Sequence, residues 1–168
     1  MKNIGALQVT TPGDREITLT RAFYAPRHLV FDAWTQPELL KRWLGVFGGW
    51  SFTVCEVDLT VGGGFRFVWR GPDSAEMGMR GVYREIVPSE RIVNTEAFDD
   101  PWYPGEAVGT LTLVEQGGTT TATNTVRYAS KEARDAVLKS DMAEGVAASY
   151  DKLDELLAEA PGGTAGTA

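Results

Sequence analysis

Residues 50–70 read WSFTVCEVDLTVGGGFRFVWR, in which two runs of alternating side chains flank three consecutive glycines. Trp50 and Phe52 share one face of the first run, and Phe67 and Trp69 share one face of the second. A period of two is typical of a strand with one buried face. No Lys-Ser/Thr pair follows the glycines, so they predict a turn between two strands rather than a phosphate-binding loop.

The same period continues on the C-terminal side of this segment. Short turns such as Pro88-Ser89-Glu90 and Gly117-Gly118 separate the apolar runs, and strands joined by short turns form an antiparallel meander. One further alternating run lies upstream. We therefore expect about seven strands, over residues 15–23, 50–55, 65–70, 77–87, 91–98, 107–114 and 119–128.

Helical spacing appears on both sides of these strands. Pro26 suits the first turn of a short helix that ends near residue 36, and a second short helix is expected over residues 38–43. Ser130 suits the N-cap of a helix that starts at Lys131. A longer helix is expected over residues 141–158, with an apolar stripe formed by Met142, Val146, Tyr150, Leu153 and Leu157.

A strongly curved sheet cannot bury its concave face on itself, and the long C-terminal helix is the element available to cover it. The expected fold class is α+β: a curved antiparallel sheet of about seven strands wrapped on a long C-terminal helix, with two short helices after the first strand. We expect a flexible N-terminal lead-in at residues 1–14, a single domain at 15–158 and a disordered tail at 159–168, which is rich in small residues.

Charge and hydropathy exclude several classes of partner. The 168 residues carry a formal net charge of −7. Such an acidic surface repels phosphate backbones and anionic lipids, so we expect neither nucleic acid nor a membrane as a partner. No apolar run has the length of a membrane span, and residues 1–14 lack the apolar core of a secretory signal, so we expect a cytoplasmic protein.

The chain has a single cysteine, Cys55, and a single histidine, His28. One cysteine excludes an intramolecular disulfide, and the two residues together are too few for a zinc site built from histidine and cysteine. His28 falls in the first turn of the first helix, where we expect a surface side chain rather than a catalytic one. We expect no metal and no cofactor.

Four phrases of the sequence resemble one protein family. They are RAFYAPRHLVFDAW at residues 21–34, TQPELLKRW at 35–43, DLTVGGGFR at 58–66 and GVYREIVPSERIV at 81–93. With this order of elements, the chain resembles the activator of heat-shock protein 90 ATPase homologue-like family of the SRPBCC (START-like) superfamily over about residues 15–158. The resemblance implies the Bet v 1-like helix-grip fold. Members of the superfamily bind lipids or hormones, cyclise polyketides or stimulate a chaperone, so the resemblance leaves the function open.

Aromatic and methionine side chains gather in or beside the expected strands, where they either fill a solid core or form the walls of an apolar pocket. On the expected C-terminal helix the small Gly145 and Ser149 reduce the volume that the helix sends toward the sheet. We therefore favour a ligand-binding cavity between sheet and helix. Its expected lining residues are Trp43, Phe47, Phe67, Trp69, Met79, Tyr83, Glu96, Phe98, Trp102, Met142, Val146, Ser149 and Tyr150.

Two registers are compatible with the strand at residues 91–98. In one, every second residue from Ile92 to Phe98, including Asn94 and Glu96, faces the concave side. Burial would then raise the pKa of Glu96 and make it a candidate acid or base. In the other register the intervening residues face inward and Glu96 lies in solvent.

The leading hypothesis is a protein that binds a small hydrophobic or aromatic molecule and is not obviously catalytic. One alternative is a chaperone-ATPase activator-like protein-interaction module, with a chaperone as the partner. A second is a cyclase- or hydrolase-like enzyme that uses a cavity carboxylate, for which Glu96 is the one catalytic candidate. Both a monomer and a homodimer are compatible with the sequence.

Overall fold

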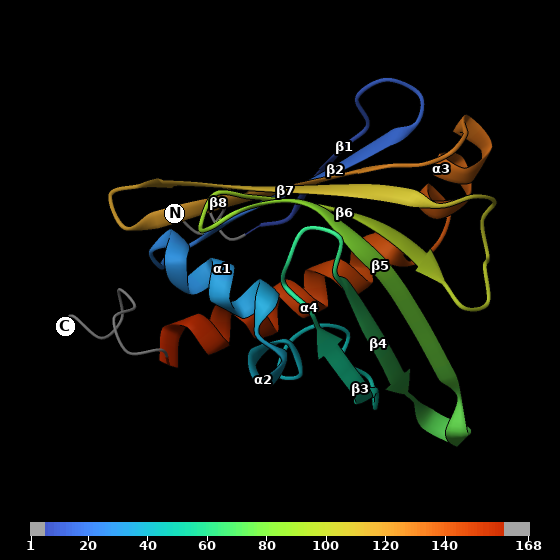
Figure 1. Ribbon diagram of the computed structural model, residues 1–168, viewed down its shortest axis with the longest axis horizontal. Coiled ribbons are helices and arrows are strands. Elements are labelled where there is room, and N and C mark those ends of the chain that lie inside the picture. The colour runs from blue at the N-terminus through green and yellow to red at the C-terminus, as the bar shows by residue number, and fades with distance from the viewer. Residues whose placement is uncertain (1–5, 160–168) are drawn as a thin grey trace.

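The computed structural model describes residues 6–159. Within that range the chain forms an eight-stranded sheet that arches over α1, α2 and α4 (Figure 1). In chain order the elements are β1 (Gln8–Thr10), β2 (Glu16–Phe23), α1 (Arg27–Thr35), α2 (Pro37–Leu40), β3 (Ser51–Val57), β4 (Gly64–Arg70), a short 3-10 helix (Pro72–Ser74), β5 (Glu76–Val87), β6 (Arg91–Phe98), β7 (Ala107–Gln116), β8 (Thr119–Arg127), α3 (Lys131–Leu138) and α4 (Met142–Glu159).

Neighbouring strands are all antiparallel, in the spatial order β1-β2-β8-β7-β6-β5-β4-β3. From β3 to β8 each strand pairs with the next one along the chain, which is the expected meander. Because β2 pairs with β8, α1 and α2 carry the chain from one side of the sheet to the other before β3 begins. The α+β helix-grip fold expected from the sequence is confirmed.

The sheet has one strand more than expected. Gln8–Thr10 lies inside the stretch expected to be a flexible lead-in, yet it forms β1 and pairs with β2 at Val9↔Leu19 and its neighbours. β8 pairs with only one edge of β2, so the other edge of β2 offers unpaired backbone N–H and C=O groups. β1 forms its strand pairing with this second edge. Residues 1–5 of the expected lead-in, and the expected tail apart from Glu159, lie outside the described residues.

The apolar stripe of α4 faces the concave side of the sheet. Tyr150, Leu153 and Leu157 are buried there, as the helical spacing predicts. The ring of Tyr150 packs edge-on against Phe23 of β2 and Trp34 of α1, with ring centroids 5.7 Å and 5.6 Å away. The helix, the first long strand and α1 therefore share one core, which is the arrangement that closes the sheet.

An ion pair fixes the second half of α4 to the sheet. Arg21 of β2 is buried, and its Nη1 donates to Asp151 Oδ1 over 3.1 Å, while Nη2 lies 3.7 Å from Asp154 Oδ2. Its guanidinium carbon also lies 5.1 Å from the ring centroid of Phe23. A charged side chain in this position stays buried because two carboxylates of α4 reach it from the solvent side.

The preceding helix, α3, is capped as expected. Ser130 Oγ accepts a hydrogen bond from the Ala133 backbone N–H over 3.1 Å. The buried Arg134 of α3 donates to the carbonyl oxygen of Glu16 over 3.1 Å, which docks this helix at the start of β2.

No helix within residues 6–159 is long and apolar enough to cross a membrane.

Candidate functional site

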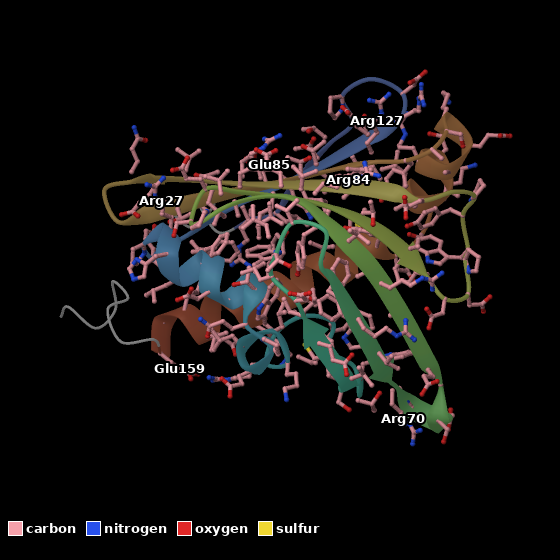
Figure 2. The ribbon with its side chains drawn as sticks, viewed as in Figure 1. Arg27, Arg70, Arg84, Glu85, Arg127 and Glu159 are labelled. Carbon is pink, nitrogen blue, oxygen red and sulfur yellow. The ribbon has the colours of Figure 1, made fainter. Side chains whose placement is uncertain are left out.

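Between the sheet and α4 lies a cavity of about 310 Å³, here called the outer cavity. Met77 is 40% exposed and lines it, so this end of the cavity reaches the protein surface. Charged side chains such as Arg70 and Arg127 lie on the outside of the molecule (Figure 2), and neither of them lines this space. Its lining residues are Leu19, Trp34, Trp43, Leu44, Gly45, Phe47, Trp50, Trp69, Met77, Met79, Phe98, Asn124, Met142, Gly145, Val146, Ser149 and Tyr150.

A second space of about 130 Å³, here called the inner cavity, lies deeper under the sheet. It shares Trp34, Leu44, Met79 and Asn124 with the outer cavity, so the two spaces adjoin at these side chains. The inner cavity carries the polar groups of the site. Its lining residues are Trp34, Leu40, Leu44, Phe65, Phe67, Met79, Tyr83, Ile92, Asn94, Glu96, Leu111 and Asn124.

The loop between α2 and β3, residues 41–50, forms one wall of the outer cavity and is held by hydrogen bonds to three other elements. Trp43 Nε1–H donates to the carbonyl of Ala33 in α1, and Trp69 Nε1–H of β4 donates to the carbonyl of Leu44, both over 2.9 Å. The backbone N–H of Gly45 donates to Ser149 Oγ of α4 over 3.0 Å. The wall is therefore pinned to a helix on each side and to the sheet.

The space expected beside Gly145 is partly occupied by the protein itself. A Cβ on Gly145 would lie 3.3 Å from the ring carbon Cζ of Phe47, so this glycine lets the Phe47 ring approach α4 closely. Ser149 is buried and uses its Oγ to accept the Gly45 hydrogen bond. Both small residues line the outer cavity, but each also holds the loop against the helix.

The side chain of Glu96 faces the interior, together with Ile92 and Asn94, which decides between the two registers left open by the sequence. Space for its carboxylate comes from Gly109 on the neighbouring strand β7. A Cβ on Gly109 would lie 3.0 Å from Glu96 Oε2 and 3.7 Å from Asn124 Oδ1. Glu96, Gly109 and Asn124, on three adjacent strands, thus form one polar spot in an apolar cavity.

Burial raises the pKa of the Glu96 carboxyl to about 7. Glu96 is half-buried, and the surface it retains faces the inner cavity rather than bulk water. None of the hydrogen bonds or ion pairs found within residues 6–159 involves its carboxylate. The carboxyl group can therefore exchange a proton near neutral pH, or hold a charge that a bound molecule compensates.

Four tyrosines surround this region. Burial raises the pKa of Tyr83 to about 12. Burial also raises the pKa of Tyr103, Tyr128 and Tyr150, and the negative charge of Glu96 raises each of them further. These phenols therefore stay protonated at neutral pH and act as neutral hydrogen-bonding groups.

The structure brings together all but one of the residues that the sequence analysis proposed for a cavity. Trp102 is the exception, because it is 45% exposed and lines neither cavity; it packs against Phe98 and Tyr103. Those that line the outer cavity are Trp43, Phe47, Trp69, Met79, Phe98, Met142, Val146, Ser149 and Tyr150, and those that line the inner cavity are Phe67, Met79, Tyr83 and Glu96.

Sequence reasoning missed Trp34 and Asn124, which line both cavities. A signal for Asn124 exists in the sequence, because it alternates in phase with the buried Ala122 and Val126 of the same strand.

Elsewhere the structure agrees with the surface position expected for His28, whose side chain is exposed. Residues 6–159 contain no group of three or more His, Cys, Asp and Glu side chains placed to hold a metal ion.

Solved structures with the same architecture come from several bacteria. A protein from Rhodobacter sphaeroides is 34% identical, with a TM-score of 0.84 over 92% of this chain and 99% of that chain. A protein from Chromobacterium violaceum is 28% identical, with a TM-score of 0.76 over 86% and 97% of the two chains. A protein from Mycobacterium smegmatis, 24% identical with a TM-score of 0.80 over 92% and 98%, supports the fold alone.

No curated protein matches this sequence. A family model does match, and it covers residues 24–158, which run from the end of β2 through nearly all of α4 and include most of the cavity walls. The model's description is "Activator of Hsp90 ATPase homolog 1-like protein". The match bears out the resemblance carried by the four sequence phrases, and the chain therefore belongs to the activator of Hsp90 ATPase homolog 1-like family, within the SRPBCC superfamily.

Proposed function

We propose that this protein binds a small hydrophobic or aromatic molecule between its sheet and α4. The observation that carries the proposal is the outer cavity, a space of about 310 Å³ walled by aromatic and aliphatic side chains. Protein cores are packed as densely as organic crystals and leave few voids larger than a water molecule. A void of this size, close to the lower end of the roughly 300–1,000 Å³ typical of ligand pockets, fits a binding site.

The shape of the site supports a ligand with an apolar body. Trp43, Trp69 and Tyr150 are buried around the outer cavity, and the indole N–H groups of the two tryptophans already donate to backbone carbonyls, so they need not face a ligand. What they offer the cavity is aromatic surface, which favours flat or aliphatic groups. The deeper polar spot around Glu96 would then contact one end of the ligand.

A cavity-filling variant with a matched control tests the proposal. Val146→Trp places an indole in the outer cavity, whereas Val114→Trp makes the same change on β7 at a position that is 63% exposed and lines neither cavity. The neutral probe 4-phenylbutan-1-ol should raise the melting temperature of the wild type and of Val114→Trp but not that of Val146→Trp. A ligand at about 100 times its Kd stabilises a native state by about 2.7 kcal/mol, which a thermal shift detects.

Native mass spectrometry of the purified protein adds an independent measurement, since a co-purified ligand appears as a mass difference that Val146→Trp removes. Two outcomes would overturn the proposal. One is a wild-type protein that neither carries a ligand nor shifts with the alcohol or with a screen of lipids and aromatic compounds. The other is an equal shift in Val146→Trp, which would place binding outside the cavity.

A second candidate function is stimulation of a chaperone ATPase, and the observation that favours it is the family match over residues 24–158. Its test is the ATPase rate of the heat-shock protein 90 of the same cell with this protein in large excess. A rate increase that survives Val146→Trp would support an interaction surface separate from the cavity. An unchanged rate, together with no complex in a pull-down, would remove this candidate.

A further inference from the structure

Among the described residues that line the two cavities, Glu96 is the only one with an acidic or basic side chain that can carry a charge near neutral pH. Every other lining residue is apolar, an amide, a serine, a tyrosine or a glycine. Two arginines on other strands of the sheet have carboxylate partners of their own: Arg21 pairs with Asp151 and Asp154, and Arg80 pairs with Asp99. A carboxylate in an apolar cavity without a cationic partner is destabilised, so a ligand that supplies the missing positive charge gains binding energy there.

Oxygen atoms that can accept hydrogen bonds lie beside Glu96. Glu96 Oε2 and Asn124 Oδ1 would lie 3.0 Å and 3.7 Å from a Cβ added to Gly109, so both oxygens border the same space. Asn94 donates its Nδ2–H to the Thr95 carbonyl, which leaves its Oδ1 as an acceptor. Converging acceptor oxygens match a ligand group with several N–H donors. A ligand carboxylate would instead bring a second negative charge next to Glu96.

The remaining walls of the inner cavity suit a cation as well. Trp34, Phe65, Phe67 and Tyr83 line it, and the negative faces of aromatic rings attract ammonium groups, most strongly where water is excluded. The inner cavity measures about 130 Å³, enough for a small head group, and opens beside Met79 into the larger apolar space. The net charge of −7 also raises the local concentration of cations over that of anions.

We propose that the ligand is an amphipathic amine, whose ammonium group pairs with Glu96 in the inner cavity while its apolar body fills the outer cavity. This inference rests on the proposed function, because it names the chemical class of the molecule that the cavity binds. Proton exchange follows from it. In the empty protein, burial brings the pKa of Glu96 to about 7, and a bound ammonium group lowers that pKa again, so binding near pH 7 releases protons from Glu96.

Within the part of the chain that the structure describes, the other groups around this site would not supply those protons. Tyr83 of β5, Tyr128 beyond β8, Tyr150 of α4 and Tyr103 in the loop before β7 all have raised pKa values and keep their protons near pH 7. Asn94 and Asn124 do not titrate, and Arg21, which acts on Tyr150 from β2, is paired with Asp151 and Asp154. Proton release on binding is therefore a signature of Glu96.

Three probes with one skeleton separate the possibilities: 4-phenylbutan-1-amine, 4-phenylbutan-1-ol and 4-phenylbutanoate. Isothermal titration at pH 8 should give the amine at least about tenfold tighter binding than the alcohol, a difference of about 1.4 kcal/mol, and no binding of the carboxylate. In Glu96→Gln the preference for the amine over the alcohol should disappear. Glu56→Gln, a change at an exposed glutamate of β3, should leave all three affinities unchanged.

Titrations of the amine near pH 7 in buffers of different ionisation enthalpy measure the proton release directly, with wild-type protein and independently of how well the variant folds. Equal binding of alcohol and amine would overturn this inference and leave the proposed function intact. Tighter binding of the carboxylate, absence of proton release, or an amine preference that persists in Glu96→Gln would also overturn it. If none of the three probes binds, the proposed function itself loses its support.

Discussion

The backbone N–H of Gly45 donates a hydrogen bond to Ser149 Oγ over 3.0 Å, and this bond joins the loop between α2 and β3 to the middle of α4. Gly45 adopts a φ of +71°, a conformation that residues with a Cβ rarely take. A Cβ at this position would also lie 2.8 Å from Trp69 Nε1, whose N–H donates to the adjacent carbonyl of Leu44. Gly45 is thus where backbone conformation and close packing both require a glycine.

Gly45→Ala should therefore cost more stability than the same change at Gly48. Gly48 lies in the same loop with a φ of +62°, but a Cβ there would have no heavy atom within 4 Å. Gly48→Ala pays only the backbone strain, about 1 kcal/mol, whereas Gly45→Ala also displaces the Trp69 ring and should cost about 2–4 kcal/mol. Urea denaturation followed by tryptophan fluorescence measures both. If both variants lose the same free energy of unfolding, the Trp69 ring can move away from the added methyl group without cost.

The ion pairs of Arg21 predict a non-additive effect. Asp151 and Asp154 are 72% and 48% exposed, so either carboxylate alone can be replaced at a cost of less than about 1 kcal/mol, because the other still faces the guanidinium. The double variant Asp151→Asn/Asp154→Asn leaves the buried Arg21 without a carboxylate. We expect it to lose about 2 kcal/mol or more, exceeding the sum of the single changes. Chemical denaturation of the wild type, the two single variants and the double variant gives the four free energies of unfolding of this double-mutant cycle. If the losses of the two single variants simply add up to the loss of the double variant, the proposed sharing of Arg21 is contradicted.

The sheet could be predicted because its signal is local. In residues 65–70 the aromatic Phe65, Phe67 and Trp69 recur at every second position, and β4 covers these residues, from Gly64 to Arg70. β1 could not be predicted this way, since its three residues are too few to show a period and they are held by pairing with the edge of β2. An element that depends on a partner strand leaves little trace in its own sequence.

The candidate site was predictable in outline but not in its chemistry. Aromatic residues at alternating positions indicated the walls. The side on which Glu96 lies was undecided, because both faces of its strand mix polar with apolar residues, and Thr95 on the other face is buried as well. What settles it is the space provided by Gly109, a residue on the neighbouring strand. For Trp102 the residue type was misleading. A tryptophan is usually buried, but the position of Trp102 in its loop exposes the side chain.

Gly145→Ala should affect stability and ligand binding in opposite directions. Gly145 lies inside α4, where alanine is favoured over glycine by about 1 kcal/mol. The added methyl group would lie 3.3 Å from the tip of the Phe47 ring, which can shift by a few tenths of an ångström. We expect a gain of about 0.5–1 kcal/mol in the free energy of unfolding, and several-fold weaker binding of 4-phenylbutan-1-ol, because the same methyl narrows the outer cavity. Unchanged binding would place the ligand away from Gly145.

Burial of the Glu96 carboxyl makes folding stability depend on pH. Its pKa is about 7 in the folded protein, against an ordinary value of 4.5. Between these values the folded protein binds the proton more tightly than the unfolded chain does, so the free energy of unfolding falls as the pH rises from about 4.5 to about 7. Below about pH 4.5 the protonated Glu96 carboxyl contributes fully to the free energy of unfolding, and above about pH 7 this contribution is lost. A shift of this size corresponds to about 3 kcal/mol.

Glu96→Gln removes that dependence, because the amide does not titrate. Measured by urea denaturation from about pH 4.5 to pH 8, the variant should therefore gain about 3 kcal/mol relative to the wild type as the pH rises, while Glu56→Gln follows the wild type throughout. Asp99 and Asp135, whose pKa values are lowered by their arginine and lysine partners, act at lower pH and are unchanged in Glu96→Gln, so they cancel in its comparison with the wild type. Parallel curves for Glu96→Gln and wild type would mean that Glu96 keeps an ordinary pKa, and that water reaches it in the empty cavity.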